Sequence, residues 1–144
     1  MMDRTTLILS FLTLIFISAC ASPATPPPVP TPGGELTAGV LASFAVKGET
    51  FNIWVIDSRL IDQLTQPGTK DIFPMGPILP GPGLGDHNSP WNWHFSESDL
   101  KLVSSVEPEC DVPPSKVEDN LIYFIEVLGK YCPNAKLLVT TQYP

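Results

Sequence analysis

Alternation of hydrophobic and polar residues after position 35 predicts a domain built mainly from β-strands. Two strands are expected at 41–47 and 50–57, joined by a tight turn at Gly48-Glu49. Hydrophobic side chains occupy both faces of the second strand. They are Phe51, Ile53 and Val55 on one face and Trp54 and Ile56 on the other. A strand that is apolar on both faces needs cover on both, which favours a central place in the sheet.

Four more segments of the domain read as extended. They are 72–79, 91–95, 100–106 and 135–142. Pro74 and Pro77 lie inside the first of them. Because proline cannot donate a backbone hydrogen bond, this segment suits only an edge or an irregular strand.

Two helices are expected between these strands. Asp57 or Ser58 can cap a short helix that ends at Pro67-Gly68. A longer helix follows Ser115, which has with Glu118 the spacing of a capping box, where each side chain satisfies a free backbone N–H. Hydrophobic residues spaced three and four apart mark its buried face, and it is expected to stop at a glycine. These residues are Val117, Leu121, Phe124, Ile125 and Leu128, with Gly129 as the stop.

The resulting order of elements is β-β-α-β-β-β-α-β. This order predicts an α+β domain over residues 35–144, in which one short and one long helix cover a mainly antiparallel sheet. A segment of this length closes one modest hydrophobic core. No internal repeat divides it, so we expect a single domain.

The first twenty residues have a different pattern. An apolar run at 7–17 is about half the roughly 20 residues that a membrane-spanning helix needs. Residues 1–19 therefore have the character of a secretory signal peptide. The sequence Ile17-Ser18-Ala19-Cys20 resembles the lipobox of bacterial lipoproteins, in which the cysteine is lipidated and becomes the new amino terminus. The alternative is an ordinary secretory signal that leaves Cys20 as a free thiol.

Residues 20–34 form a proline-rich segment that cannot build a core. Six of the seventeen prolines of the chain fall between Pro23 and Pro32. This composition favours a stiff polyproline II spacer with a reach of about 40 Å. We expect Cys20 to anchor the chain in the cell membrane or an outer membrane, with the domain held clear of the lipid and outside the cytoplasm.

The formal net charge of the chain is −7, and its eight lysines and arginines are scattered singly. Binding along a nucleic-acid backbone requires a run or a face of basic side chains. Nucleic acid is therefore not an expected partner, and acidity of this size mainly favours solubility.

The segment Trp-Asn-Trp-His-Phe at residues 91–95 is the most unusual in the domain. If it is extended, Asn92 and His94 lie on the face opposite the aromatic side chains. His94 is then either a structural hydrogen-bonding residue or a ligand or general base. In the second case its partners would be His87, Asp86, Glu109 or Asp111. No spacing typical of a zinc site accompanies it, so we predict no metal and no cofactor.

Residues 80–90 form a long loop of glycine, proline and polar residues. The run Gly81-Pro82-Gly83-Leu84-Gly85 looks superficially like a phosphate loop, but prolines and an apparent strand follow where a helix would be needed. A loop of this length in a small domain is a fair recognition surface.

Cys110 and Cys132 remain once Cys20 is lipidated. An extracytoplasmic compartment permits disulfides, so we expect these two to pair. Bridged Cα atoms lie within roughly 7 Å of each other, so the segments that flank the long helix would have to fold back along it. The alternatives are two separate buried thiols, or a site that they share with His94.

Several short motifs occur in one order along the domain. They are Gly48-Glu49-Thr50-Phe51, Met75-Gly76-Pro77-Ile78, Pro90-Trp91-Asn92-Trp93-His94-Phe95, Glu109-Cys110-Asp111, Pro114-Ser115-Lys116-Val117-Glu118 and Tyr131-Cys132-Pro133. The series resembles the N-terminal domain of the calmodulin-binding protein BP-seventy-four, a domain also found alone in secreted bacterial proteins. The resemblance covers residues 43–139. It implies no reaction, and since calmodulin binding belongs to the parent protein, that function is not carried over.

These features favour a membrane-anchored, extracytoplasmic lipoprotein that presents a small non-catalytic binding or structural domain. One alternative is a small metal-assisted hydrolase centred on His94. Another is an inhibitor or immunity-type protein that presents the loop 80–90 to the cleft of an enzyme.

Overall fold

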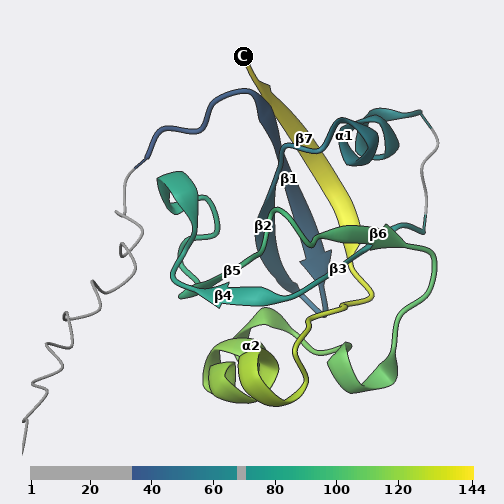
Figure 1. Cartoon of the computed structure of the whole chain (residues 1–144). Coiled ribbons are helices and arrows are strands. Elements are labelled where there is room, and N and C mark those ends of the chain that lie inside the picture. The colour runs from purple at the N-terminus through teal and green to yellow at the C-terminus, as the bar shows by residue number, and fades with distance from the viewer. Residues whose placement is uncertain (1–33, 68–70) are drawn as a thin grey trace, which may run out of the picture.

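The computed structural model describes residues 34–67 and 71–144 (Figure 1). The predicted signal peptide, Cys20 and all but the last residue of the predicted proline-rich segment lie outside the described residues. The described part is α+β, as predicted, and every strand pairing in it is antiparallel.

Three long strands form the main sheet, in the order β2-β1-β7. Strands β1 (Gly39–Val46) and β2 (Glu49–Val55) form a hairpin whose two-residue turn, Lys47-Gly48, has positive φ at both positions. A type I′ turn needs two positive φ angles, and glycine supplies the second without steric cost. Strand β7 (Lys136–Tyr143) pairs with the other side of β1. The central strand is therefore β1, and the prediction that β2 is central is wrong.

Both faces of β2 are nevertheless covered. Phe51, Ile53 and Val55 are 2% exposed or less and face the core. Trp54 points the other way, and its ring meets the ring of Tyr143 edge-on at 5.5 Å between centroids. A strand can thus be buried on both faces and still lie at the edge of a sheet, because other segments supply the cover.

Two short ribbons lie in front of the main sheet in Figure 1. They are β3 (Phe73–Met75) with β6 (Lys101–Val103) and β4 (Ile78–Pro80) with β5 (Trp93–Phe95). The predicted strand 72–79 is thus split into two, at Gly76-Pro77. Every strand of a two-stranded ribbon is an edge, which is where proline is tolerated, as the sequence predicted.

The first helix, α1 (Ser58–Thr65), begins as the sequence predicted. The Asp57 carboxylate accepts the backbone N–H groups of Arg59, at 2.8 Å, and Leu60, at 3.3 Å. Hydrogen bonds, chiefly from the Leu60 backbone and then from the Arg59 side chain, lower the pKa of Asp57.

The second predicted helix, over 115–128, is interrupted. It divides into α2 (Pro114–Asp119) and a π-helical turn at Tyr123–Val127. Asn120 has non-helical backbone angles between them, and its side-chain amide donates to the Lys116 carbonyl at 3.0 Å. Asparagine competes for the backbone groups of a helix in this way, which explains the break. Despite this break, two residues of the predicted buried face, Val117 and Phe124, are buried in the core.

The predicted capping box at the start of α2 is wrong. Pro113 is the residue before the helix and has no side-chain cap. The N–H and hydroxyl of Ser115 both donate to the carboxylate of Glu49 on β2, at 2.8 and 2.7 Å. Glu118 instead accepts two hydrogen bonds from Asn92, at 2.9 and 2.6 Å. The two side chains that were expected to cap the helix therefore tie α2 to β2 and to the residue before β5.

The core is an aromatic cluster around Phe51. Its neighbours, with ring centroids 5.7 to 6.0 Å away, are Phe44, Trp93, Phe95 and Tyr131. Trp93 and Phe95 are 0% and 2% exposed, so these two aromatic side chains share the face of β5 that is turned to the core. The Tyr131 hydroxyl donates to the Val112 carbonyl at 2.7 Å, and burial raises the pKa of Tyr131.

Candidate functional site

The loop between β4 and β5 lies folded against the free edge of β2. Asn88, which is fully buried, accepts the backbone N–H of Asn52 at 2.8 Å and donates to the Trp93 carbonyl at 2.7 Å. The Trp91 indole N–H donates to the Thr50 carbonyl at 2.8 Å. Side chains thus occupy positions where a neighbouring strand would bind, and they close this edge of the sheet.

The Asn52 side chain extends the same network. Its carbonyl oxygen accepts from the Ser43 hydroxyl at 2.7 Å, and its NH₂ group donates to the His87 carbonyl at 2.8 Å. The sequence prediction missed both asparagines. One sequence signal could have revealed Asn88. It lies in a loop rich in glycine and proline, and asparagine side chains in loops often hydrogen-bond nearby backbone groups.

The two histidines come together, and His87 is one of the four partners that the sequence offered for His94 as a ligand or base. The ring centroids of His87 and His94 are 5.9 Å apart and the rings are nearly perpendicular. Each Nδ1 lies against a carbonyl oxygen of the loop, His94 at 2.8 Å from Gly81 and His87 at 2.9 Å from Leu84. These bonds hold the rings in place and fix the loop to β5.

His87 is 5% exposed, and its Nε2 has no hydrogen-bond partner among the described residues. Burial is the main cause that lowers the pKa of His87, and the neighbouring His94 adds to it. The ring is therefore neutral near pH 7. It packs so closely on Gly83 that a β-carbon there would lie 2.2 Å from the imidazole Cε1. Only glycine fits beside this buried ring.

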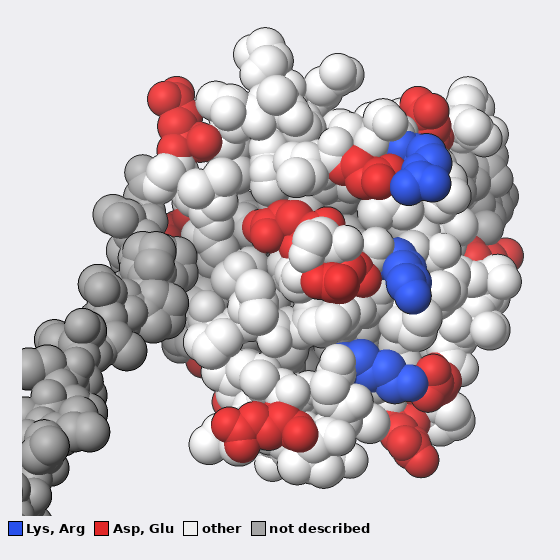
Figure 2. All heavy atoms as spheres, viewed as in Figure 1, with Lys and Arg blue, Asp and Glu red and all other residues white. Residues whose placement is uncertain are grey.

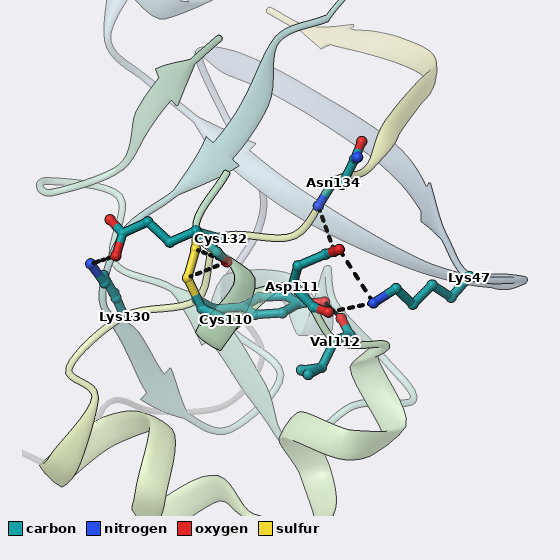
Figure 3. Close-up of a disulfide and its surroundings, with 9 residues drawn as sticks. Lys47, Cys110, Asp111, Val112, Lys130, Cys132 and Asn134 are labelled. Atoms are coloured by element: carbon teal, nitrogen blue, oxygen red, sulfur yellow. Dashed lines mark hydrogen bonds and ion pairs between the residues drawn. A yellow bond between two sulfur atoms is a disulfide. The ribbon is translucent and has the colours of Figure 1, made fainter. Parts of the chain in front are cut away.

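The other candidate residues do not join the histidines. Asp86 is exposed, and Asn92 is bound to Glu118. The Asp111 carboxylate accepts the Asn134 N–H at 2.9 Å and pairs with Lys47 at 3.3 Å (Figure 3). Within residues 34–67 and 71–144, no three His, Cys, Asp or Glu side chains are grouped so as to hold a metal ion.

Cys110 and Cys132 form a disulfide beside Asp111, with their Cα atoms 5.1 Å apart (Figure 3). Both are fully buried. The chain returns to the bridge after the π-helical turn, and Tyr131 exchanges two backbone hydrogen bonds with Gly76 at 2.8 and 3.1 Å. The flanks of the helical segment thus fold back, as the bridge requires.

Two shallow hollows on the described part of the surface are lined by neither His87 nor His94. One, of about 590 Å³, lies between α1 and the segment 97–101, and the other, of about 500 Å³, lies between 71–73 and 134–137. On the face shown in Figure 2, acidic side chains outnumber the few basic ones, which lie apart from one another. The side chains of His87, Asn88, Trp91 and His94 instead form hydrogen bonds with backbone N–H and C=O groups.

Comparison with known proteins identifies the family of the chain. The family model described as the BP-seventy-four N-terminal domain matches residues 39–144. The chain belongs to this family. The match covers nearly the whole described part and agrees with the resemblance seen in the motifs. No curated protein and no solved structure matches the chain.

None of the helices formed by the described residues is long and apolar enough to cross a membrane.

Proposed function

We propose that this protein is a lipid-anchored, non-catalytic binding module displayed outside the cytoplasm. The proposal rests on one observation: the polar side chains of the candidate site form hydrogen bonds within the domain. His87 and His94 face loop carbonyls, and Asn88 is wholly engaged with backbone groups. Catalysis needs an acid, base or nucleophile free to meet a substrate. These groups serve the scaffold instead.

The anchor is the second part of the proposal and rests on the sequence. Cys20 follows an apolar run too short to span a bilayer and two small residues, and a proline-rich spacer follows it. Two or more acyl chains hold a protein at a membrane effectively without release. The domain would then work where it is displayed, by contact with another surface.

The observations do not favour either alternative function. A metal-assisted hydrolase would need ligands beyond His87 and His94, and the carboxylate of Asp111 is turned to Lys47 and Asn134. An inhibitor that inserts the loop 80–90 into a cleft would need that loop to project. Its residues His87 and Asn88 are instead buried against β2.

Replacing Cys20 with serine is expected to leave the protein without lipid and to alter processing of the signal peptide, because a hydroxyl cannot form the thioether. Membrane fractionation and intact-mass analysis measure this. The matched control is Ala21→Ser, which changes the neighbouring residue and should keep the lipid. Wild-type protein found wholly in the soluble fraction, with no added mass on Cys20, would show that the anchor does not exist.

A further inference from the structure

The two edges of the main sheet differ in whether other groups cover them. The edge of β2 is closed by Asn88 and Trp91, as described above. Strand β7 forms the opposite edge, and β1 is its only partner strand among residues 34–67 and 71–144. It is eight residues long, with the sequence Lys-Leu-Leu-Val-Thr-Thr-Gln-Tyr. An uncovered strand of this length is a template for pairing with another strand.

The hairpin shows which backbone groups of β7 point outward. Val46 and Glu49 flank the two-residue turn and are a hydrogen-bonded pair, and such pairs alternate along a hairpin. Even-numbered residues of β1 therefore bond to β2 and odd-numbered residues to β7. The Asn52 N–H, opposite Ser43, accordingly points away from β1 and meets Asn88.

The same alternation applies across β1 and β7. Leu41 lies opposite Thr141, and Ser43 lies opposite Val139, so these residues use their backbone groups within the sheet. Thr140 and Gln142 therefore direct N–H and C=O groups to the free edge. In the part of the chain that the structure describes, no side chain or backbone group of another segment hydrogen-bonds to them.

We propose that this edge pairs with β7 of a second copy of the chain, antiparallel and centred on Thr141. In that register Thr140 of one copy exchanges two hydrogen bonds with Gln142 of the other, and two-fold symmetry repeats the exchange. The outward backbone groups of Thr140 and Gln142 in one copy thus match those of Gln142 and Thr140 in the other. The result is one continuous six-stranded sheet.

Side chains on the outer face fit the same register. Val139, which is 55% exposed, comes to lie opposite Tyr143 of the second copy. A β-branched residue opposite an aromatic one is a stabilising cross-strand pair. Tyr143 already meets Trp54 within its own copy. The pairing therefore continues an existing row of apolar side chains across the junction.

Charge opposes the approach of a second copy over most of the surface, but not at this edge. The chain has a net charge of −7, so two copies repel each other over most of their surfaces. Residues 137–143 contain no charged side chain, and the only charged residue of β7 is Lys136 at its start. The edge is thus a place where two copies meet without opposing carboxylates. This inference deepens the proposed function, on which it rests, since anchoring in one membrane would raise the local concentration of copies.

Cysteine cross-linking in membranes from cells that produce the full chain tests the pairing. In the proposed register the two copies of Thr141 form a non-hydrogen-bonded pair, with Cα atoms about 4.5 Å apart, a separation that a disulfide spans. Thr141→Cys should form a cross-linked dimer under mild oxidation at least about ten-fold faster than Val139→Cys, whose copies are too far apart to bridge. Non-reducing gels give the rates.

Three controls make the result decisive. Ile122→Cys, at a site 72% exposed and away from β7, gives the rate of random collision. Gln142→Pro, added to Thr141→Cys, removes an outward N–H without touching the bonds to β1 and should abolish the fast cross-link. The chain with no added cysteine forms a dimer only if Cys20 is a free thiol, so a failure of the anchor is seen separately.

Equal rates for Thr141→Cys, Val139→Cys and Ile122→Cys would overturn the proposal. So would a Thr141→Cys chain that stays monomeric, which is also the result expected if the edge receives a strand from a different protein. A fast cross-link at Thr141 that Gln142→Pro removes supports the second copy.

Discussion

Trp93→Ala is expected to lower the free energy of unfolding by about 3–5 kcal/mol, the usual range for truncating a buried aromatic side chain. Trp93 is 0% exposed, and its ring contacts those of Phe51 and Tyr131 at centroid distances of 5.9 and 5.3 Å. Removing it opens a cavity in the centre of the aromatic cluster. Denaturant unfolding followed by circular dichroism measures the loss.

The matched control for this variant is His94→Ala, one residue further along the same strand. His94 is half-buried and contributes one hydrogen bond, to the Gly81 carbonyl, so its loss should cost about 1 kcal/mol. If His94→Ala proved the more damaging of the two, the faces of β5 would not be as described. Trp93→Phe should fall between the two, because it keeps a ring and removes an indole N–H that has no partner among the described residues.

Removing the disulfide is expected to cost about 3 kcal/mol of stability. Cys110 and Cys132 are 22 residues apart in the sequence, and a bridge between them restricts the unfolded chain over the whole of α2 and the π-helical turn. Replacing both cysteines with serine or alanine should therefore shift the unfolding midpoint strongly. Alanine avoids burying two hydroxyls and is the better variant.

Mass spectrometry checks the bridge itself. Wild-type protein that is unfolded without reductant and then alkylated should carry no label on Cys110 or Cys132. Reduction before alkylation should add a label at both. Labels at both cysteines without reduction would contradict the disulfide, and an unchanged unfolding midpoint in the double-alanine variant would contradict its role in stability.

Local patterns predicted those features of the fold that local physical chemistry determines. Alternation placed Phe51, Ile53 and Val55 together on one face of their strand, which the structure shows to be the core face. Asp57 caps α1, as a carboxylate before a helix does. The α+β class followed from the order of strands and helices. The cysteine pair followed from the parity left by Cys20, with the disulfide now seen between Cys110 and Cys132.

Features that depend on contacts between residues far apart in the sequence could not be predicted from local patterns. Ser115 and Glu118 have the spacing of a capping box, but Glu49 and Asn92 offer them partners from other elements. Two hydrophobic faces suggested a central place for β2, whereas loops and Tyr143 provide the cover. No pattern within a single strand reveals which strand becomes its neighbour.

The candidate site was likewise predictable only in part. The sequence singled out the segment 91–95 as unusual and offered His87 as one alternative partner of His94, and the structure brings the two rings together. Asp111 was another of the alternative partners of His94, but it lies with Lys47 and Asn134 beside the disulfide. Asn88, the residue that holds the loop in place, was missed because its partners, Asn52 and Trp93, become neighbours only through the fold.

The central claim is that polar groups of the loop between β4 and β5 serve as scaffold by closing the edge of β2. Hydrogen exchange of the Asn52 backbone amide, followed by NMR on dilute, detergent-solubilised protein, tests it most directly. Although this N–H points away from β1, it is bound to the buried Asn88. The account predicts that it exchanges slowly, at a rate close to that of core amides, while the outward N–H of Gln142 on β7 exchanges rapidly. An Asn52 amide that exchanged as fast as that of Gln142 would contradict the account.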